Sequence, residues 1–147
     1  MKLKAIPMPE YIDIHAHTNF NAYSEDREEV IKRTLEENVW VINVGTQQDT
    51  SMKAVEMAHQ HQKGVYAIIG LHPVHTSKSY HDENELGGEG KAFTSRGESF
   101  DHDYYLNLVR DEKVVAIGEC GLDYYRLEEE SIKKQKEAFH RFSLPKG

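Results

Sequence analysis

The sequence has little cysteine, no long apolar run and no excess of positive charge. Cys120 is the single cysteine, so no disulfide can form within the chain, and a reducing compartment such as the cytoplasm fits. No stretch approaches the roughly 18 consecutive apolar residues of a membrane helix, and residues 1–9 lack the apolar segment of a signal peptide. We therefore expect a cytoplasmic protein with no membrane partner.

The charge balance is acidic. Lys and Arg total 18 and Asp and Glu total 25, which gives a net charge of −7 with histidine neutral. This balance argues against a broad basic surface that binds nucleic acid tightly. It leaves open a nuclease that meets phosphate through bound metal, because each divalent cation adds two positive charges locally.

The length is sufficient for one domain. A complete eight-stranded β/α barrel takes about 200 to 250 residues, more than the 147 present. Short apolar runs alternate with helix-like segments. The predicted strands are 11–17, 40–45, 65–71 and 114–118, and the predicted helices are 24–39, 49–62, 101–110 and 128–142. Four such units predict a parallel sheet, and a polar insertion without periodicity occupies about 76–100.

Local signals mark several element ends. Asp26 with Glu29 is typical of a capping pair at the start of the first helix. Gly64 stands where a left-handed residue is expected after the second helix. His59 and His61 lie at i and i+2 of that helix and face different directions, so we expect them on a solvated surface. Cys120 is expected to pack toward the helices.

The first chemical signal is Asp-Ile-His-Ala-His at 13–17, at the end of the first predicted strand. Residues i and i+2 of a strand share one face about 6.5 to 7 Å apart, so His15 and His17 can reach one cation. Asp13 is expected on the same face, beneath them. Ligands of parallel β/α folds sit at the carboxyl ends of strands. The alternative is a set of polar residues with ordinary hydrogen-bond partners.

Two further strand ends carry polar residues. Val115, Ile117 and Glu119 are expected on one face, and a carboxylate above apolar residues is costly unless a cation pairs with it. A carboxylate can also bridge two metals, as phosphoester hydrolysis uses; the alternative is an exposed loop residue. His72 stands before Pro73 at the rim of the third strand, and by itself it favours a structural or substrate-contacting role.

Taken together, these segments resemble the TatD family of metal-dependent hydrolases, often described as deoxyribonucleases. The motifs that carry the resemblance are YIDIHAH at 11–17, VGT at 44–46, IIGLHP at 68–73 and AIGECGLDYYR at 116–126, with Gln135 and Phe139 in the helix that follows. The resemblance implies a TIM-type β/α barrel of the metallo-dependent hydrolase kind. It also implies hydrolysis of DNA phosphodiester bonds, with DNA as substrate.

The resemblance further implies roles for individual residues. His15 and His17 would bind one divalent metal, Glu119 would bridge two metals and be catalytic, and His72 and Arg126 would contact substrate. The sequence does not choose among Mg, Mn and Zn, and a complete family member holds two ions. The family pattern continues with two more histidines and a metal-binding aspartate. We therefore expect 1–147 to be a single truncated domain, a half barrel of four β-α units with three protein ligands.

Two alternative functions stay open. One is a catalytically inactive truncated remnant that binds only metal or a partner subunit. The other is an amidohydrolase-like hydrolase that shares the strand-end H-x-H, against which GECGLDYY at 118–125 argues. A half barrel would leave edge strands unpaired and its inward face uncovered, which favours a homodimer. The residues expected on that face are Tyr11, Tyr66, Ile68, Val115 and Ile117.

Overall fold

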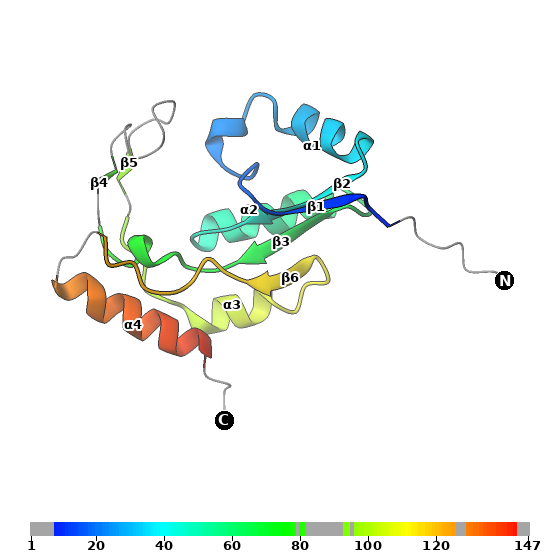
Figure 1. The fold of residues 1–147 in the computed structure, drawn as a ribbon. Coiled ribbons are helices and arrows are strands. Elements are labelled where there is room, and N and C mark those ends of the chain that lie inside the picture. The colour runs from blue at the N-terminus through cyan, green and yellow to red at the C-terminus, as the bar shows by residue number, and fades with distance from the viewer. Residues whose placement is uncertain (1–7, 79, 82–92, 95, 126–128, 144–147) are drawn as a thin grey trace.

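The computed structural model describes residues 8–78, 80–81, 93–94, 96–125 and 129–143 (Figure 1). The strands are β1 (Tyr11–Ala16), β2 (Val39–Val44), β3 (Val65–Ile69), β4 (Tyr80–His81), β5 (Phe93–Thr94) and β6 (Val114–Ile117). The helices are α1 (Arg27–Glu36), α2 (Gln48–His59), α3 (His102–Leu108) and α4 (Glu129–Ser143), with short 3-10 helices at Asn21–Tyr23 and Pro73–Thr76.

Four strands form one parallel sheet in the order β1-β2-β3-β6. Helices separate these strands along the chain, so the predicted α/β fold of four β-α units is confirmed. α1 packs against β2, and α2 packs against β2 and β3. In Figure 1, α1 lies at the β1 end of the sheet, and α3 and α4 lie at the β6 end. The arrangement is a partial β/α barrel.

Helices cover one face of the central strands, and this is where the core sits. Val41, Val65, Ala67 and Ile69 are at most 3% exposed. Ile31 of α1 packs into the same cluster as Val41 and Val65. Burying an aliphatic side chain of this size stabilises a fold by about 1.5 to 3 kcal/mol, so these contacts hold the strands to their helices.

Apolar side chains of the two outer strands are exposed. Ile12 and Ile14 of β1 are 48% and 67% exposed, and Val115 and Ile117 of β6 are 50% and 46% exposed. Tyr66 and Ile68, on the inner strand β3, are half-buried. The sheet therefore has one packed face and a second, largely open one, as the half-barrel prediction requires.

β1 contains one residue more than β2 over the same length. Asp13 lies level with Val41 and Ala16 lies level with Asn43, so three steps along β1 match two along β2. An extra residue of this kind is a β-bulge, and it reverses which side chains face which way, because strand side chains alternate. The two halves of β1 are therefore out of phase.

The bulge corrects two predictions. Val41 and Asn43 both lie on the helix-covered face, so Asp13 and Ala16 point that way, and His15 and His17, on either side of Ala16, point to the open face. Asp13 therefore does not share a face with the histidines. Tyr11, two residues before Asp13, is likewise not on the open face, and its 65% exposure reflects its place on an outer strand. Both predictions are wrong because counting by twos fails across a bulge.

β6 contains a second bulge. Val114 lies level with Ala67, whereas Ala116 lies level with Ile68 and Ile117 with Ile69. Ala67 and Ile69 lie on the helix-covered face, so Ile117 points that way as well. The prediction that Val115, Ile117 and Glu119 share one face, with Ile117 on the open face, is therefore also wrong.

The helix ends differ from the prediction in detail. α1 begins at Arg27, not Ser24, and the side chain of Asp26 makes no capping hydrogen bond, so the predicted capping pair is not formed. Before α2, Gln47 N–H donates to Thr50 Oγ1 at 2.9 Å. Gly64 has φ +86° as predicted, and a Cβ there would lie 2.6 Å from Leu35 Cδ2.

The segment 76–100 is partly described. Tyr80 pairs with Thr94 and His81 with Phe93 in a short antiparallel ladder, while 82–92 lie outside the described residues. Segment 96–100 contacts α2 and the 3-10 helix Pro73–Thr76, since Glu98 accepts a hydrogen bond from Gln48 N–H and its own N–H donates to His75 O. Within the described part of the chain, no helix is long and apolar enough to cross a bilayer.

Candidate metal centre

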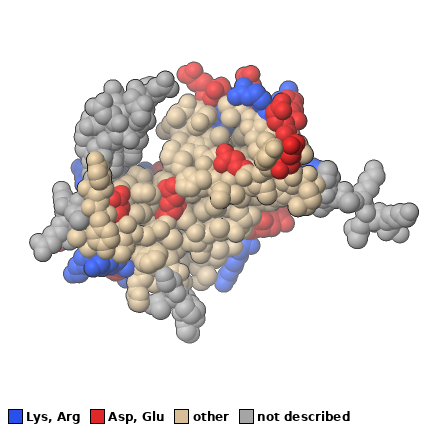
Figure 2. Space-filling model, in the orientation of Figure 1, with Lys and Arg blue, Asp and Glu red and all other residues tan. Residues whose placement is uncertain are grey.

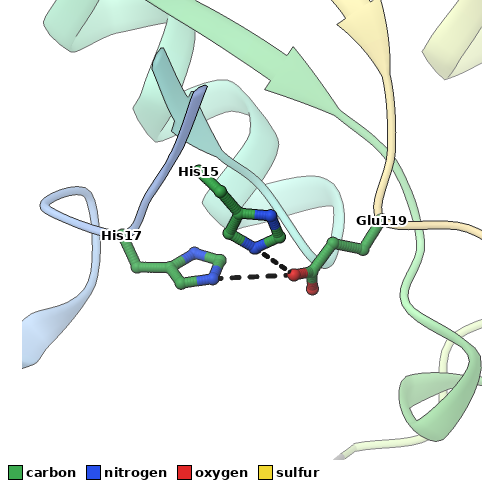
Figure 3. A group of neighbouring side chains, drawn as sticks. All are labelled: His15, His17 and Glu119. Carbon is green, nitrogen blue, oxygen red and sulfur yellow. Dashed lines mark ion pairs between the residues drawn. The ribbon is translucent and has the colours of Figure 1, made fainter. Parts of the chain in front are cut away.

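The candidate centre begins where β1 ends. His15 and His17 project from the end of this strand toward the open face, and their rings lie edge to face with centroids 5.0 Å apart. Both side chains point toward Glu119 (Figure 3). The alternation predicted for the histidines themselves is therefore present, although it starts only after the bulge.

Glu119 reaches this place because β3 and β6 end close together. Gly118 N–H donates to Ile69 O at 2.9 Å, and a Cβ on Gly70 would lie only 2.4 Å from Gly118 O. Only glycine allows so close an approach. Glu119 follows Gly118 directly, so the packing of two strand ends carries its carboxylate to the histidines.

Three side chains form one compact donor set. His15 Nε2 is in direct contact with Glu119 Oε1, and His17 Nε2 is 3.7 Å from the same oxygen. One ligand atom from each of the three residues lies within 4.8 Å of the others. Two imidazole nitrogens and a carboxylate oxygen suit zinc, manganese or iron. The residues present therefore fit a divalent metal.

A fourth polar side chain borders the set. His72 Nε2 lies 3.8 Å from Glu119 Oε2, the carboxylate oxygen that does not face His15 and His17. The Nδ1 atom of His72 accepts a hydrogen bond from Val74 N–H at 3.2 Å, at the start of the 3-10 helix Pro73–Thr76. The structure thus brings His72 to the three predicted ligands. Arg126, predicted to contact substrate, lies outside the described residues.

The contact between His17 and Glu119 shifts both pKa values. It raises the pKa of His17, with burial opposing it and the Val44 carbonyl adding to it. The same contact is the largest effect that lowers the pKa of Glu119, against burial, and His72 and His15 lower it further. Glu119 is therefore anionic, the form that a metal ligand requires.

Contacts outside the donor set hold the ring of His17 in place. Its Nδ1 lies 3.0 Å from Val44 O and its ring stacks on Phe20, with centroids 4.5 Å apart. Because a carbonyl only accepts, Nδ1 carries the proton in this contact, and in the neutral ring Nε2 has the lone pair that a metal bond needs. Outer contacts of this kind commonly fix metal-binding histidines.

Two residues that sequence reasoning missed hold the turn after His17. Asn43, fully buried, accepts from Thr18 N–H at 3.0 Å and from Thr18 Oγ1 at 2.6 Å. Arg27 donates to the carbonyls of Thr18, Asn19 and Phe20 at 2.6, 3.4 and 2.7 Å. A polar residue inside an apolar strand was the one available signal for Asn43. We call these two residues the histidine clamp.

An open hollow of about 530 Å³ lies beside the cluster, which we call the strand-end hollow. It is lined by His72, Pro73, Glu119, Cys120, Gly121, Leu122, Asp123, Tyr124 and Tyr125. Cys120 is exposed here, so the prediction that it packs toward the helices is wrong. Figure 2 shows Lys and Arg side chains gathered over α4 and acidic side chains over α1.

Comparison with known proteins identifies relatives of the chain. It is 38% identical over 114 residues to the uncharacterized metal-dependent hydrolase YabD of Bacillus subtilis, covering 77% of this chain and 37% of YabD. It is 33% identical over 115 residues to the 3'-5' ssDNA/RNA exonuclease TatD of Erwinia tasmaniensis, covering 78% of this chain and 38% of that protein. The chain therefore spans less than half the length of these relatives.

The fold has a counterpart among solved structures. The TatD homologue YjjV of Escherichia coli K12 superposes with a TM-score of 0.62 at 22% sequence identity, covering 92% of this chain and 46% of YjjV. At this identity the likeness concerns the fold. The model of the TatD-related DNase family matches residues 12–144. The chain therefore belongs to the family of TatD-related DNases.

Proposed function

We propose that the chain is a metal-dependent nuclease component that hydrolyses DNA phosphodiester bonds. The observation that carries the proposal is the convergence of His15, His17 and Glu119 at the ends of β1 and β6, with one ligand atom from each within 4.8 Å. In our proposal these residues hold a divalent cation, and Glu119 is also the catalytic carboxylate. When bound, such a cation polarises a phosphate and lowers the pKa of water.

The remaining residues have roles that follow from their chemistry. His17 presents Nε2 because Val44 O holds Nδ1. His72 Nδ1 accepts from Val74 N–H, so Nε2 carries the ring proton beside Glu119 Oε2, and we propose that it donates to a phosphate oxygen. Arg126 stays a prediction for phosphate contact. Lys133, Lys134 and Lys136, exposed on α4, offer further positive charge to a polynucleotide.

The printed names of the relatives support a nucleic-acid substrate. One is a 3'-5' ssDNA/RNA exonuclease, and another, from Encephalitozoon cuniculi, is a putative deoxyribonuclease TATDN1 homologue that is 32% identical over 131 residues. A second candidate is a chain that binds metal without cleaving DNA, because the donor set found in the described residues offers three protein ligands. No observation favours the amidohydrolase alternative.

We also propose that two copies associate through the open sheet. The exposed side chains of Ile12 and Ile14 on β1 and of Val115 on β6 are the observation behind this proposal. Size-exclusion chromatography with light scattering tests it, and a well-folded monomer at all concentrations contradicts it. The reducing, cytoplasmic location is a proposal that rests on the single cysteine.

A paired binding and cleavage assay tests the nuclease proposal. The chain is titrated with Mn²⁺ or Zn²⁺ and assayed on DNA beside a His15→Ala, His17→Ala double variant. A His140→Ala variant, which removes an exposed histidine of α4, is the matched control. We expect metal-dependent cleavage by the unaltered chain and the control only. Equal cleavage by the double variant contradicts the proposal, and metal binding without cleavage favours the second candidate.

A further inference from the structure

The strand-end hollow carries two exposed tyrosines next to the candidate centre. We propose that Tyr124 and Tyr125 form a stacking platform for an unpaired nucleobase of the strand whose phosphodiester bond is cleaved. This inference rests on the proposed nuclease function, because it names a subsite of the same site. Tyr124 is 57% exposed and Tyr125 is 87% exposed, although both belong to a wall that also contains Glu119 and His72.

The chemistry of the hollow favours a base over a phosphate. Apart from Glu119 and His72, which we assign to metal and phosphate, its described lining contains the carboxylate of Asp123 and neither Lys nor Arg. A phosphate in this part of the hollow would meet like charge. An uncharged planar group meets aromatic faces, together with carboxylate oxygens that can accept from its N–H groups. The volume of about 530 Å³ lies within the range of small-ligand pockets.

The turn that carries the tyrosines is fixed in advance. Asp123 N–H donates to Gln135 Oε1 at 2.8 Å, and Gln135 is only 2% exposed. Gln135 Nε2 in turn donates to Ser131 Oγ at 3.0 Å within α4. Tyr125 N–H donates to Asp123 Oδ1 at 2.8 Å. A surface held by a buried side chain loses less entropy when it binds a ligand than a loose loop does.

Stacking also selects the state of the nucleic acid. A base can lie flat on an aromatic ring only when it is free of its own neighbours, as at a single-stranded end. The platform therefore favours single-stranded DNA or RNA over a blunt duplex. Stacking on an aromatic side chain is sequence-tolerant, because every base has a π face. We expect little preference among bases at this position.

The test measures binding without metal, so that it does not depend on cleavage. Fluorescence anisotropy in EDTA at low salt follows a labelled oligothymidylate and an abasic phosphodiester strand of the same length. Tyr125→Ala is compared with Tyr125→Phe, which keeps the ring, and with Tyr11→Ala, which removes an exposed tyrosine at the opposite end of β1. We expect Tyr125→Ala to weaken oligothymidylate binding about 5- to 100-fold.

The controls decide the interpretation. We expect Tyr125→Phe and Tyr11→Ala to bind oligothymidylate like the unaltered chain, and all variants to bind the abasic strand alike. Equal losses on both strands, no loss at all, or no binding of oligothymidylate by the unaltered chain contradict the platform. If the unaltered chain does not cleave DNA with metal but binds oligothymidylate as expected, the nuclease proposal is contradicted. The binding comparison among the variants still tests the platform in that case. Cleavage that is insensitive to Tyr125→Ala contradicts only the platform.

Discussion

The two sides of the candidate centre are built differently. On the histidine side, the turn after His17 lies under a buried amide and a guanidinium, since Asn43 is fully buried and Arg27 donates to three consecutive carbonyls. On the carboxylate side, Glu119 stands at the border of the open strand-end hollow. The described support of this side consists of backbone N–H groups, with Gly118 N–H donating to Ile69 O before Glu119 and Asp123 N–H donating to Gln135 Oε1 after it.

The difference separates two tasks. A metal ligand must be held in one place, and buried polar networks supply that rigidity because every broken bond leaves an unsatisfied group. A substrate must enter and leave, and an open hollow lined by a fixed turn allows this. The comparison predicts that changes on the histidine side alter metal affinity, whereas changes beneath the hollow alter stability and substrate binding.

The largest effect is expected at Glu119, the residue of the carboxylate side that contacts both histidines. Glu119→Gln removes the negative charge that faces His15 and His17. Loss of an outer-shell partner alone typically lowers metal affinity about 10- to 100-fold, so we expect loss of a ligand to lower it by at least about 100-fold. Calorimetric titration with Zn²⁺ measures the change. An affinity within threefold of that of the unaltered chain would show that Glu119 does not bind the metal.

A smaller effect is expected at the histidine clamp. Arg27→Ala leaves the carbonyls of Thr18, Asn19 and Phe20 without their charged donor, so His17 is held less firmly. We expect metal affinity to fall about 10-fold. Arg33→Ala, an exposed residue of the same helix, is the control and should change nothing. Equal affinities for the two variants would show that the clamp does not orient the ligand.

At Gln135, which holds the turn beneath the hollow, we expect a loss of stability with little change in metal affinity. Gln135→Ala removes the acceptor of Asp123 N–H and a buried partner of Ser131. Two hydrogen bonds are lost, and each contributes about 0.5 to 1.5 kcal/mol, so the free energy of unfolding in urea should fall by about 1 to 3 kcal/mol. The Zn²⁺ affinity should stay within about twofold. A drop in affinity as large as that of Arg27→Ala would erase the distinction between the two sides.

The smallest effect is expected far from both sides, at Asp111. His59 Nε2 lies 2.9 Å from both carboxylate oxygens of Asp111. Burial, the largest single influence, raises the pKa of Asp111, but His59 and the Lys113 N–H together outweigh it, so the net pKa is lowered from 3.8. The stabilisation is thus present above pH 3.8 and is lost as the pH falls through the lowered value.

Asp111→Asn measures this contribution. Because the pair is partly exposed and screened by solvent, we expect less than about 1 kcal/mol at pH 7. Urea unfolding of the variant should therefore show a weaker loss of stability between pH 5 and pH 3, roughly the range over which an aspartate titrates. Zn²⁺ affinity at pH 7 should be unchanged. An identical pH dependence in both proteins would mean that the pair adds nothing.

Sequence patterns were sufficient for the parts of this molecule that depend on local periodicity. The apolar runs predicted four parallel strands, and the strand-end positions of His15, His17 and Glu119 predicted that they meet. His59 lies on the surface as expected, with a 45% exposed side chain. These features depend on spacing along one element and on the rule that parallel strands end at one edge. His61 was predicted to share that helix and a solvated surface, but it lies beyond the end of α2 and its Nε2 is buried.

Features that depend on partners distant in the chain were not predictable in this way. Asn43 accepts a hydrogen bond from Thr18, 25 residues earlier in the chain, and Arg27 of α1 donates to a carbonyl of the turn that follows β1. The bulge in β1 was invisible because it exists only relative to the register of β2. A count by twos therefore assigned Asp13 to the wrong face, although the two histidines beyond the bulge keep their correct relation to each other.

The central claim is that His15, His17 and Glu119 form one metal centre. Crystals of the unaltered chain soaked in Zn²⁺ and measured at the zinc absorption edge test it most directly. The account predicts an anomalous peak about 2.0 to 2.2 Å from a nitrogen of each histidine and a Glu119 oxygen. A protein that takes up zinc elsewhere and shows no peak between these three side chains would contradict it.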